Sequence, residues 1–479
     1  MNRTVPPFLR AAAEGFAAAG GALYVVGGRP RNALLGLAGG DWDVCGPLPP
    51  DEAMALFAAV PGVTIAPRDT ALGTFGALCG GEEAEYTTFR AESYGPGGGH
   101  RPQSVTFGVP QREDALRRDF TVNALYWDIA ANELKDPLGG RADLERRVLR
   151  TCRAPEETFD DDGLRLMRLV RFCAELGFVP EEATARAARE RAHLLRDIAP
   201  ERLWGELKRL LLADTKYPPR PAEPPQGMDG QAVFAPASPV ALGLHLFDEL
   251  GLLDVVLPEL AEGRGVAQRA DYHDHDVLGH AFAACAAAPP RLTDRVAALL
   301  HDVGKPAALR RGGRMVGHDR IGQGMAAEIL TRLRCPTAFV DEVSALIGVH
   351  MTDLDGRMGE GKLRLLFVRL GRARAEELID LRRADVRGSK PVPATFDPAA
   401  RWVAILARMD ADRVPWTLAD LAVNGGDLIA LTGGPGPQVG KLLAALHRHA
   451  VLRPRQNTRN ALLEQARTIW NDQRWRNEP

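Results

Sequence analysis

The sequence predicts an α+β protein, in which an N-terminal α/β domain precedes a long all-helical part. Residues 1–150 mix short apolar runs with glycine-rich breaks, which is typical of alternating strands and short helices. From about Leu164 onward the apolar residues recur at helical spacing. The length of 479 residues, at about 150 residues per domain, indicates roughly three domains.

The N-terminal domain is expected to begin with a strand, a turn, a helix and a second strand. Strands are predicted at Ala22–Val26, Trp42–Val44, Thr74–Leu78 and Glu85–Phe89, and a short helix over Pro30–Leu37. This order brings the turn after the first strand close to the second strand.

The rest of the chain should be helical, with one extended interruption. The segment LRLMRLVRFCAELGF collects its apolar residues largely on one helical face, at Leu164, Met167, Leu169, Val170, Cys173 and Leu176. Residues Tyr217–Val240 contain seven prolines in 24 positions and are expected to form a loop or linker. A histidine-rich helical segment is predicted over Asp271–Lys390, and residues 441–479 are basic, with eight Lys or Arg against three Asp or Glu.

Composition excludes several classes of protein. Apolar residues make up 45% and charged residues 25% of the chain, which argues against disorder, collagen and coiled coil. The formal charge of −2 points to no particular partner. Six scattered cysteines without a C-x-x-C pair favour reduced thiols and a cytoplasmic location. No apolar run approaches about 18 residues, so no membrane association is expected.

A double glycine follows the first predicted strand. Gly27 and Gly28 lead into Arg29, Pro30 and Arg31. Backbone N–H groups at such a turn can approach a phosphate at the start of a helix, and Pro30 fits the first helical turn. The two arginines would stand beside this anion site, although a glycine pair is more often only a turn.

Two carboxylates open the second strand. Asp41 and Asp43 are two positions apart, so in a strand they face the same side. Two converging carboxylates suit a pair of Mg²⁺ ions bridging a triphosphate and an attacking hydroxyl. Glu85, on the neighbouring predicted strand, could add a third carboxylate, with Glu82 and Glu83 as competing candidates.

A third cluster lies in the segment RRDFTVNAL. Arg117, Arg118, Asp119 and Asn123 combine two cations, an acid and an amide within seven residues. Such a set can bind ribose hydroxyls and phosphates, and a salt-bridged surface turn is the alternative.

Taken in order, these motifs resemble those of the class II nucleotidyltransferases of the tRNA CCA-adding and poly(A) polymerase family. GGRPRNALLG with DWDV resembles the metal-binding motif, RRDFTVNAL the ribose-recognition motif, and DPLGGRADLERRVLR the element that follows it. The resemblance implies a polymerase β-like head in which Asp41 and Asp43 are catalytic and hold Mg²⁺. It implies nucleotide binding by Gly27, Gly28, Arg29, Arg31, Arg118, Asp119, Asn123, Asp162, Arg165 and Arg168.

By the same resemblance, the segment DDGLRLMR selects the base. Asp162 and Arg165 would read the Watson–Crick edge of CTP or ATP, since i and i+3 share a helical face and the pair offers both acceptors and donors. An ordinary helical ion pair is the alternative. The sequence departs from the family pattern at Pro30, Asn32, Thr158 and Asp161, which leaves open whether both C and A are added.

A second constellation is rich in histidine. Six of the eleven histidines fall within residues 273–350, and crowding of this kind suggests a metal site. His280, the pair His301–Asp302 and Asp385 resemble the ligands of the HD superfamily of metal-dependent phosphohydrolases, in which His318 and His350 would be ligands of a second metal. Ni²⁺, Mn²⁺, Fe or Zn²⁺ would suit these donors. Hydrolysis of phosphoester ends such as 2′,3′-cyclic phosphates, or a purely structural role, is implied, and His273 and His275 are expected at the surface or as caps.

The C-terminal end resembles the same nucleotidyltransferase family, and its basic residues could contact the tRNA backbone. The expected RNA-binding residues are Lys441, Arg453, Arg455 and Arg459. The domains are expected to be the nucleotidyltransferase head (1–150), the helical neck with the base-selecting segment (151–216), a proline-rich linker and helical connection (217–265), the HD domain (266–400) and a C-terminal RNA-binding body (401–479).

The sequence therefore predicts an enzyme that adds C and/or A to the tRNA 3′ end, using CTP and ATP. An A-only or CC-only enzyme and a poly(A) polymerase are alternatives of the same class. An HD phosphohydrolase with a non-catalytic RNA-binding head, and a pure RNA-binding scaffold, are alternatives of other classes.

Overall fold

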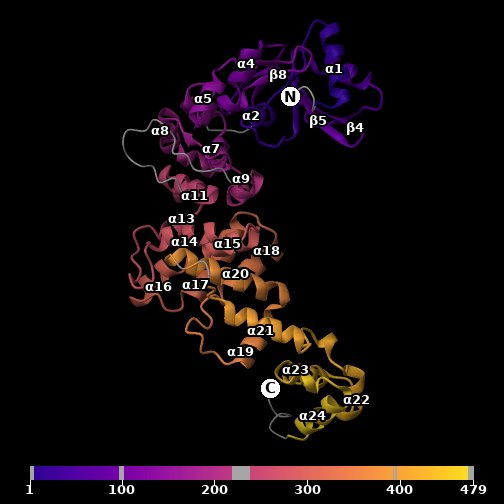
Figure 1. Cartoon of the computed structure of the whole chain (residues 1–479), viewed down its shortest axis with the longest axis vertical. Coiled ribbons are helices and arrows are strands. Elements are labelled where there is room, and N and C mark those ends of the chain that lie inside the picture. Colours follow the sequence, from indigo (N-terminus) through magenta and orange to yellow (C-terminus); the bar gives the residue numbers. More distant parts are fainter. Residues whose placement is uncertain (1–4, 96–101, 218–237, 392, 394–395, 473–479) are drawn as a thin grey trace. The chain divides into compact units, whose positions relative to one another are not determined.

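The computed structural model describes residues 5–95, 102–217, 238–391, 393 and 396–472, and divides into two compact units (Figure 1). Unit 1 comprises Met1–Ala261 with Arg332–Arg334, and unit 2 comprises Glu262–Thr331 with Cys335–Pro479. Most of the predicted proline-rich linker (218–237) and the last part of the basic end (473–479) lie outside the described residues. The finer division into head, neck, linker, HD domain and C-terminal body stays a prediction.

Unit 1 begins with a seven-stranded mixed sheet. Its order is β3 (Thr64–Pro67), β4 (Thr74–Cys79), β5 (Glu82–Thr88), β2 (Trp42–Gly46), β1 (Tyr24–Val25), β8 (Tyr126–Asp128) and β9 (Glu133–Lys135). Only the central pair β2 and β5 runs parallel. All four predicted strands are confirmed, with bounds that differ by a few residues.

The two faces of this sheet differ in what covers them. On one face, Phe16, Phe57, Phe75 and Tyr86 form an aromatic cluster that joins α1 (Pro7–Ala18) and α3 (Pro50–Ala58) to the strands. The helix predicted after the first strand is α2 (Gly28–Leu34). Further elements of this region are β6 (Arg90–Ser93), β7 (Ser104–Phe107), α4 (Gln111–Leu116), the short 3₁₀ turn η3 (Thr121–Asn123), α5 (Gly140–Arg146) and β10 (Val148–Leu149).

Because side chains alternate along β2, Asp43 lies on the face of the sheet opposite the aromatic cluster of Phe16, Phe57, Phe75 and Tyr86.

The helical part of unit 1 is built around α7 (Leu164–Leu176). It also contains α6 (Pro155–Asp161), β11 (Val179–Pro180), α8 (Glu182–Glu190), α9 (Pro200–Leu211), α10 (Ala213–Lys216), α11 (Pro239–Glu249), α12 (Leu253–Val256) and α13 (Pro258–Ala261). The predicted helix is confirmed as α7, and its six named apolar residues are all buried. Charged residues of α7 are buried as well, because Arg171 donates to Glu175 and Glu206, which pairs these groups inside the core.

The described residues of unit 2 form helices joined by loops and turns, with no strand among them. Its helices are α14 (Val277–Ala287), α15 (Leu292–Leu300), α16 (Lys305–Gly312), α17 (His318–Arg332), α18 (Thr337–Ile347), α19 (Glu360–Leu370), α20 (Arg372–Ser389), α21 (Ala400–Ala411), α22 (Gly425–Thr432), α23 (Pro437–Leu452) and α24 (Arg459–Asn471). The helices predicted over Asp271–Lys390 are confirmed, and α14 packs closely against both α15 and α20. A separate apolar core that includes Leu428, Leu442, Leu446 and Leu462 joins α22, α23 and α24.

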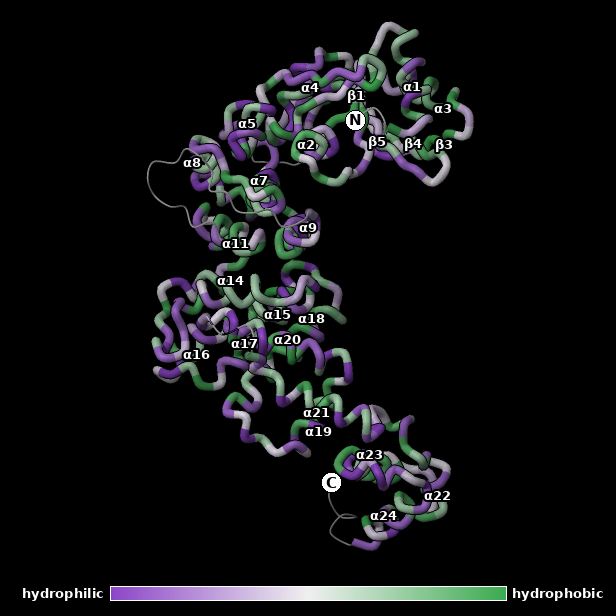
Figure 2. Tube along the Cα trace, viewed as in Figure 1, coloured by the Kyte–Doolittle hydropathy of each residue, from purple (hydrophilic) through white to green (hydrophobic). Residues whose placement is uncertain are grey.

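Hydrophobic and hydrophilic residues are interspersed along the helices of both units (Figure 2). Within the described part of the chain, no helix is both long enough and apolar enough to cross a membrane.

Candidate active site and metal centre

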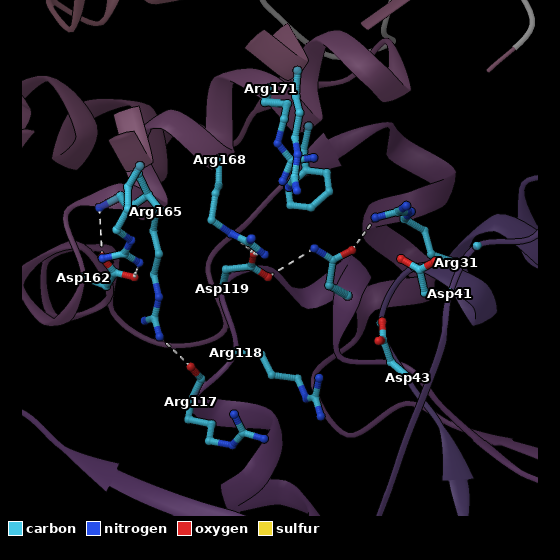
Figure 3. Close-up of a pocket in the computed structure, with 18 of the residues that line it drawn as sticks. Arg31, Asp41, Asp43, Arg117, Arg118, Asp119, Asp162, Arg165, Arg168 and Arg171 are labelled. Carbon is cyan, nitrogen blue, oxygen red and sulfur yellow. Dashed lines mark hydrogen bonds and ion pairs between the residues drawn. The ribbon is translucent and has the colours of Figure 1, made fainter. Parts of the chain in front are cut away.

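Two carboxylates line a cavity at the middle of the sheet in unit 1, and a third lies on the neighbouring strand. Asp41 directly precedes β2, Asp43 lies on it, and Figure 3 shows both on the same side of a cavity. Glu85 on β5 stands opposite Asp43 in the parallel register. Arg68 donates to Glu85 at 2.6 Å and also pairs with Glu83. The register therefore favours Glu85 as the third carboxylate.

This arrangement disfavours the charged form of the Asp43 carboxyl group. Burial first, and then the neighbouring Glu85 and Asp41, raise the pKa of Asp43 to about 6, although Arg118 and Arg29 oppose the shift. Crowded carboxylate oxygens of this kind are the donors that a hard divalent cation prefers. The residues present thus fit a divalent metal.

The glycine turn is needed for close approach to Asp43. Gly27 has φ +77°, and a Cβ at this position would lie 3.1 Å from Oδ2 of Asp43. A side chain would therefore meet both backbone strain and the carboxylate. The turn predicted at Gly27 and Gly28 thus lies between β1 and α2, as expected.

The cavity beside these carboxylates has a volume of about 660 Å³. Arginine and lysine side chains outnumber acidic ones along its wall, which suits a polyanionic ligand. Nine of the ten residues predicted to bind nucleotide line it: Gly27, Gly28, Arg31, Arg118, Asp119, Asn123, Asp162, Arg165 and Arg168. Arg29, the tenth, stacks on the Trp42 ring at 3.4 Å instead.

Asp119 and Asn123 are held by a buried hydrogen-bond network. Arg168 donates to Oδ2 of Asp119 through Nε at 2.9 Å and Nη2 at 2.5 Å, and Asn123 Nδ2 donates to Oδ1 at 3.1 Å. Burial alone would raise the pKa of Asp119, but the Arg168 guanidinium outweighs it and lowers the pKa to about 2. Arg31 Nη1 in turn donates to Asn123 at 2.5 Å. The head and α7 are thus joined through ionised, hydrogen-bonded groups.

The two predicted base readers both reach the cavity, but the expectation that they share one helical face is wrong. Asp162 is extended, with φ −148° and ψ +102°, between α6 and α7. Its Oδ1 accepts from Leu164 N at 3.1 Å, at the start of α7, while Arg202 of α9 donates to Oδ2 at 3.4 Å. Arg165, in the first turn of α7, donates to the carbonyls of Thr158 and Arg117. Asp162 therefore lies between the two helices, as the C-cap residue of α6 and directly before Gly163, the N-cap residue of α7.

Asp114 anchors arginines of the site, and the sequence analysis missed it. It has no exposed surface and accepts from Arg117 Nε at 2.8 Å, Arg118 Nη2 at 3.1 Å and Tyr126 OH at 2.7 Å. Burial would raise the pKa of Asp114, yet Arg118 and Arg117 lower it to about 2. The spacing of three and four residues to the two arginines was the signal that could have identified it.

A second cluster lies in unit 2, where the six predicted ligands form two adjacent triads. One contains His280, His301 and Asp385, the other Asp302, His318 and His350, and within each triad the donor atoms lie within 4.8 Å of one another. These residues come from α14, the end of α15, α17, the turn after α18, and α20.

The hydrogen bonds of the histidines leave lone pairs facing one another. Nδ1 of His301, His318 and His350 lies 2.6–2.8 Å from the backbone oxygens of Ala298, Met315 and Ile347. A carbonyl oxygen only accepts, so each Nδ1 carries the proton and Nε2 is a lone pair in the neutral ring. Nε2 of His318 nevertheless lies 3.2 Å from Nε2 of His350, and Nε2 of His301 lies 3.1 Å from that of His280. In the neutral rings of His318 and His350 two lone pairs thus face each other, and a cation between them would satisfy both, so the donor set fits metal binding.

The aspartates beside the histidines favour positive charge in this cluster. Burial disfavours a charged imidazole, yet Asp302 and Asp385 outweigh it and raise the pKa of His301 to about 10. Lys305 Nζ lies 2.5 Å from Asp302. The expectation for His275 is confirmed, since it is exposed, whereas that for His273 is wrong: it is half-buried and packs on the His280 ring with centroids 4.7 Å apart.

The predicted RNA-binding residues are spread over the end of unit 2. Lys441 lies on α23, Arg453 follows it, and Arg459 opens α24 with an ion pair of 2.6 Å to Asp427. Arg453 and Arg455 line a second cavity of about 560 Å³ together with Arg364 of α19. Arg453 and Arg455 therefore line the same cavity, whereas Arg459 already has a carboxylate partner in Asp427.

Three family models match the chain. A poly(A) polymerase head domain matches residues 23–150, a probable RNA- and SrmB-binding site of polymerase A matches residues 177–217, and a putative second domain of tRNA nucleotidyltransferases matches residues 321–466. The head model spans both Asp41 and Asp43. Fold and site thus define a nucleotidyltransferase with a poly(A) polymerase head.

Similarity over nearly the full length narrows this class. The chain is 33% identical to the A-adding tRNA nucleotidyltransferase of Deinococcus radiodurans, over 88% of this chain and 90% of that protein. It is 31% identical to the CCA-adding enzyme of Geobacillus stearothermophilus, over 89% and 88%. The structure of the Bacillus stearothermophilus CCA-adding enzyme in complex with CTP matches with a TM-score of 0.69 and 27% identity, over 97% of this chain and 99% of that chain. The chain belongs to the tRNA nucleotidyltransferase family, whose members are enzymes that use a divalent metal.

Proposed function

We propose that this protein extends the 3′ end of tRNA with C, A or both, using CTP and ATP. The observation that carries the proposal is a cavity lined by Asp41 and Asp43 and also by Asp162 and Arg165, with many arginines along its wall. One end of this cavity has the carboxylates of a metal site, and the other has the donors and acceptors of a base reader.

The metal proposed for this site is Mg²⁺, held by Asp41 and Asp43, with Glu85 beside them. Three carboxylate oxygens suit Mg²⁺ better than a softer ion. When bound, the metal would neutralise charge that develops on the phosphates during transfer.

The residues of the chain supply binding and orientation. The 3′-hydroxyl oxygen of tRNA forms a bond to the α-phosphorus, the bond from that phosphorus to pyrophosphate breaks, and the hydroxyl proton is released. Arg118, fixed by Asp114 and Tyr126, presents its charge to the triphosphate. Asp162 and Arg165 orient the base, and the Asp119–Arg168 pair holds α7 against the head.

The test uses two tRNA transcripts, one that ends before the first C and one that ends after CC, together with an unrelated RNA. With labelled CTP and ATP, product length separates a CCA-adding, a CC-adding and an A-adding enzyme, and extension of the unrelated RNA would indicate a poly(A) polymerase. Asp43→Ala should abolish incorporation. Incorporation by that variant at the wild-type rate would overturn the assignment of Asp43.

We propose a second activity, metal-dependent phosphohydrolysis, for the histidine–aspartate cluster of unit 2. The facing Nε2 lone pairs favour a pair of transition-metal ions, such as Ni²⁺, Mn²⁺, Fe or Zn²⁺, over a purely structural cluster. Phosphoester ends such as 2′,3′-cyclic phosphates are the proposed substrates. Retained hydrolysis by Asp43→Ala, with no transfer by the wild type, would favour a phosphohydrolase with a non-catalytic head.

The basic residues Lys441, Arg453, Arg455 and Arg459 are proposed to contact the tRNA backbone. A cytoplasmic location, where tRNA ends are matured, is proposed with this function.

A further inference from the structure

The hydroxyl of Tyr217 reaches into the core of the candidate active site from the end of the helical part of unit 1. Tyr217 directly follows α10 and is only 8% exposed. Arg31 Nη2, on α2 of the head, donates to this hydroxyl at 3.1 Å, and the hydroxyl lies 3.3 Å from Oδ1 of Asn32. Residues 185 positions apart in the chain thus share one buried polar contact.

The hydrogen bonds at Asn32 explain why these groups meet. Its Nδ2 donates to the carbonyls of Ala38 and Gly39, each at 3.1 Å, which fixes the orientation of the amide. Its Oδ1 accepts from Arg31 through Nη2 at 3.0 Å and Nε at 3.2 Å, and the Tyr217 hydroxyl lies beside the amide, 3.3 Å from Oδ1 and 3.2 Å from Nδ2. The amide is thus fully engaged, so the removal of one partner leaves another unpaired in a buried setting.

The same network runs in two directions. Through Asn32 it holds the turn at residues 38–39, which leads directly to Asp41. Through Arg31 it continues to Asn123, then Asp119, and ends at Arg168 on α7. The dashed lines in Figure 3 follow this second branch from Arg168 by way of Asp119 to Arg31.

We infer that Tyr217 is a positioning residue for nucleotidyl transfer, because its hydroxyl holds Arg31 and Asn32 at the junction that links the turn before Asp41 to Arg168 on the base-selecting helix. The inference rests on the proposed function. It also explains the departure at position 32: an amide can donate to the two carbonyls of the turn, whereas a carboxylate has no hydrogen to donate to them.

The test replaces Tyr217 by Phe, which removes the hydroxyl and keeps the ring. We expect kcat for nucleotide addition to fall about tenfold, because one or two buried hydrogen bonds are removed, with KM for the nucleotide within about twofold of wild type. Hydrogen–deuterium exchange of the peptide covering residues 33–43 should become faster without nucleotide or metal. Tyr86→Phe is the matched control, since the Tyr86 hydroxyl is also buried but bonds to the carbonyls of Gly46 and Leu48 away from the cavity.

Two results would overturn the inference: unchanged exchange of residues 33–43 in Tyr217→Phe, or equal reductions of kcat in Tyr217→Phe and Tyr86→Phe. Asn32→Asp provides a second variant, and it should accelerate exchange of the same peptide. The exchange experiment needs no turnover, so it stands even where the wild type transfers no nucleotide, an outcome that would instead refute the proposed function.

Discussion

Replacement of Asp114 by Asn should destabilise the head and weaken nucleotide binding together. Asp114 is fully buried and is the common acceptor for Arg117, Arg118 and Tyr126. Asn keeps the shape of the side chain but loses the negative charge, and its NH₂ group would face donors. The half-buried Arg118 would then lose its carboxylate partner, and Arg117 would keep only Glu92, at 3.5 Å.

The size of the effect can be worked out from the pKa. Arg118 and Arg117 lower the pKa of Asp114 from its ordinary 3.8 to about 2, and a shift of this size corresponds to about 2 kcal/mol of stability at neutral pH. Breaking a buried ion pair by removing one partner costs about 3–5 kcal/mol. We therefore expect the opening free energy of the head to fall by about 3 kcal/mol.

The pH dependence has a definite sign. Because the folded-state pKa of Asp114 lies below the unfolded value, its contribution is full above about pH 4 and disappears as the pH falls through about 2. Asp119 has a similarly lowered pKa, so the difference between wild type and Asp114→Asn isolates the Asp114 contribution. That difference should shrink in acid.

Hydrogen–deuterium exchange of peptides from β2 and β8 measures the opening free energy of the head alone, and acid unfolding followed by circular dichroism gives the pH dependence. Asp128→Asn is the control, because Asp128 is also buried but accepts from the backbone N–H of Ala131 at 2.8 Å. KM for the nucleotide should rise in Asp114→Asn because Arg118 loses its anchor. Equal destabilisation by the two variants, or an unchanged KM, would refute the reasoning.

Three further outcomes are expected. Arg202→Ala removes the donor to Oδ2 of Asp162. Since a partly exposed ion pair contributes below about 1 kcal/mol, the ratio of kcat/KM for CTP to that for ATP should change by about two- to fivefold, and an unchanged ratio would contradict a role of Arg202 in base selection. His301→Ala should lose bound metal, measured by mass spectrometry of the elements, while nucleotide addition stays normal; full metal retention would remove His301 from the ligand set. Replacing Arg453 and Arg455 by Ala should reduce the dependence of log Kd for tRNA on log salt by roughly one for each phosphate that the variant no longer touches, and an identical slope would show that they do not touch the backbone.

Local spacing was enough to predict the carboxylate pair of the head and the strands around it. Asp41 and Asp43 are two positions apart, and alternation along a strand is a local property. Glu85 remained one of three candidates because the choice depends on the register of β2 against β5, which couples residues about 40 positions apart. The break at Asp162 was also missed, because a local hydrogen bond from Leu164 N to Oδ1 of Asp162 competes with the helical pattern of the surrounding residues.

Long-range contacts explain the residues that sequence reasoning could not find. Nothing near Tyr217 signals that its hydroxyl meets Asn32, and the burial of Arg171 was not predicted because its partner Glu206 lies on another helix. In unit 2 the spacing of histidines and aspartates identified the ligand set, but only the structure shows that backbone carbonyls orient His318 and His350 toward each other.

The nearly neutral overall charge of the chain conceals an excess of positive charge around the nucleotide site. Burial lowers the pKa of both Arg31 and Arg90, and for Arg90 the neighbouring Arg117 adds to the shift. Asp114 and Asp119 raise the pKa of Arg118 and Arg168 instead, and each already serves two or more donors. A triphosphate supplies the missing negative charge. The arginines are therefore arranged for the bound state, and the carboxylates beneath them fix each guanidinium before the nucleotide arrives.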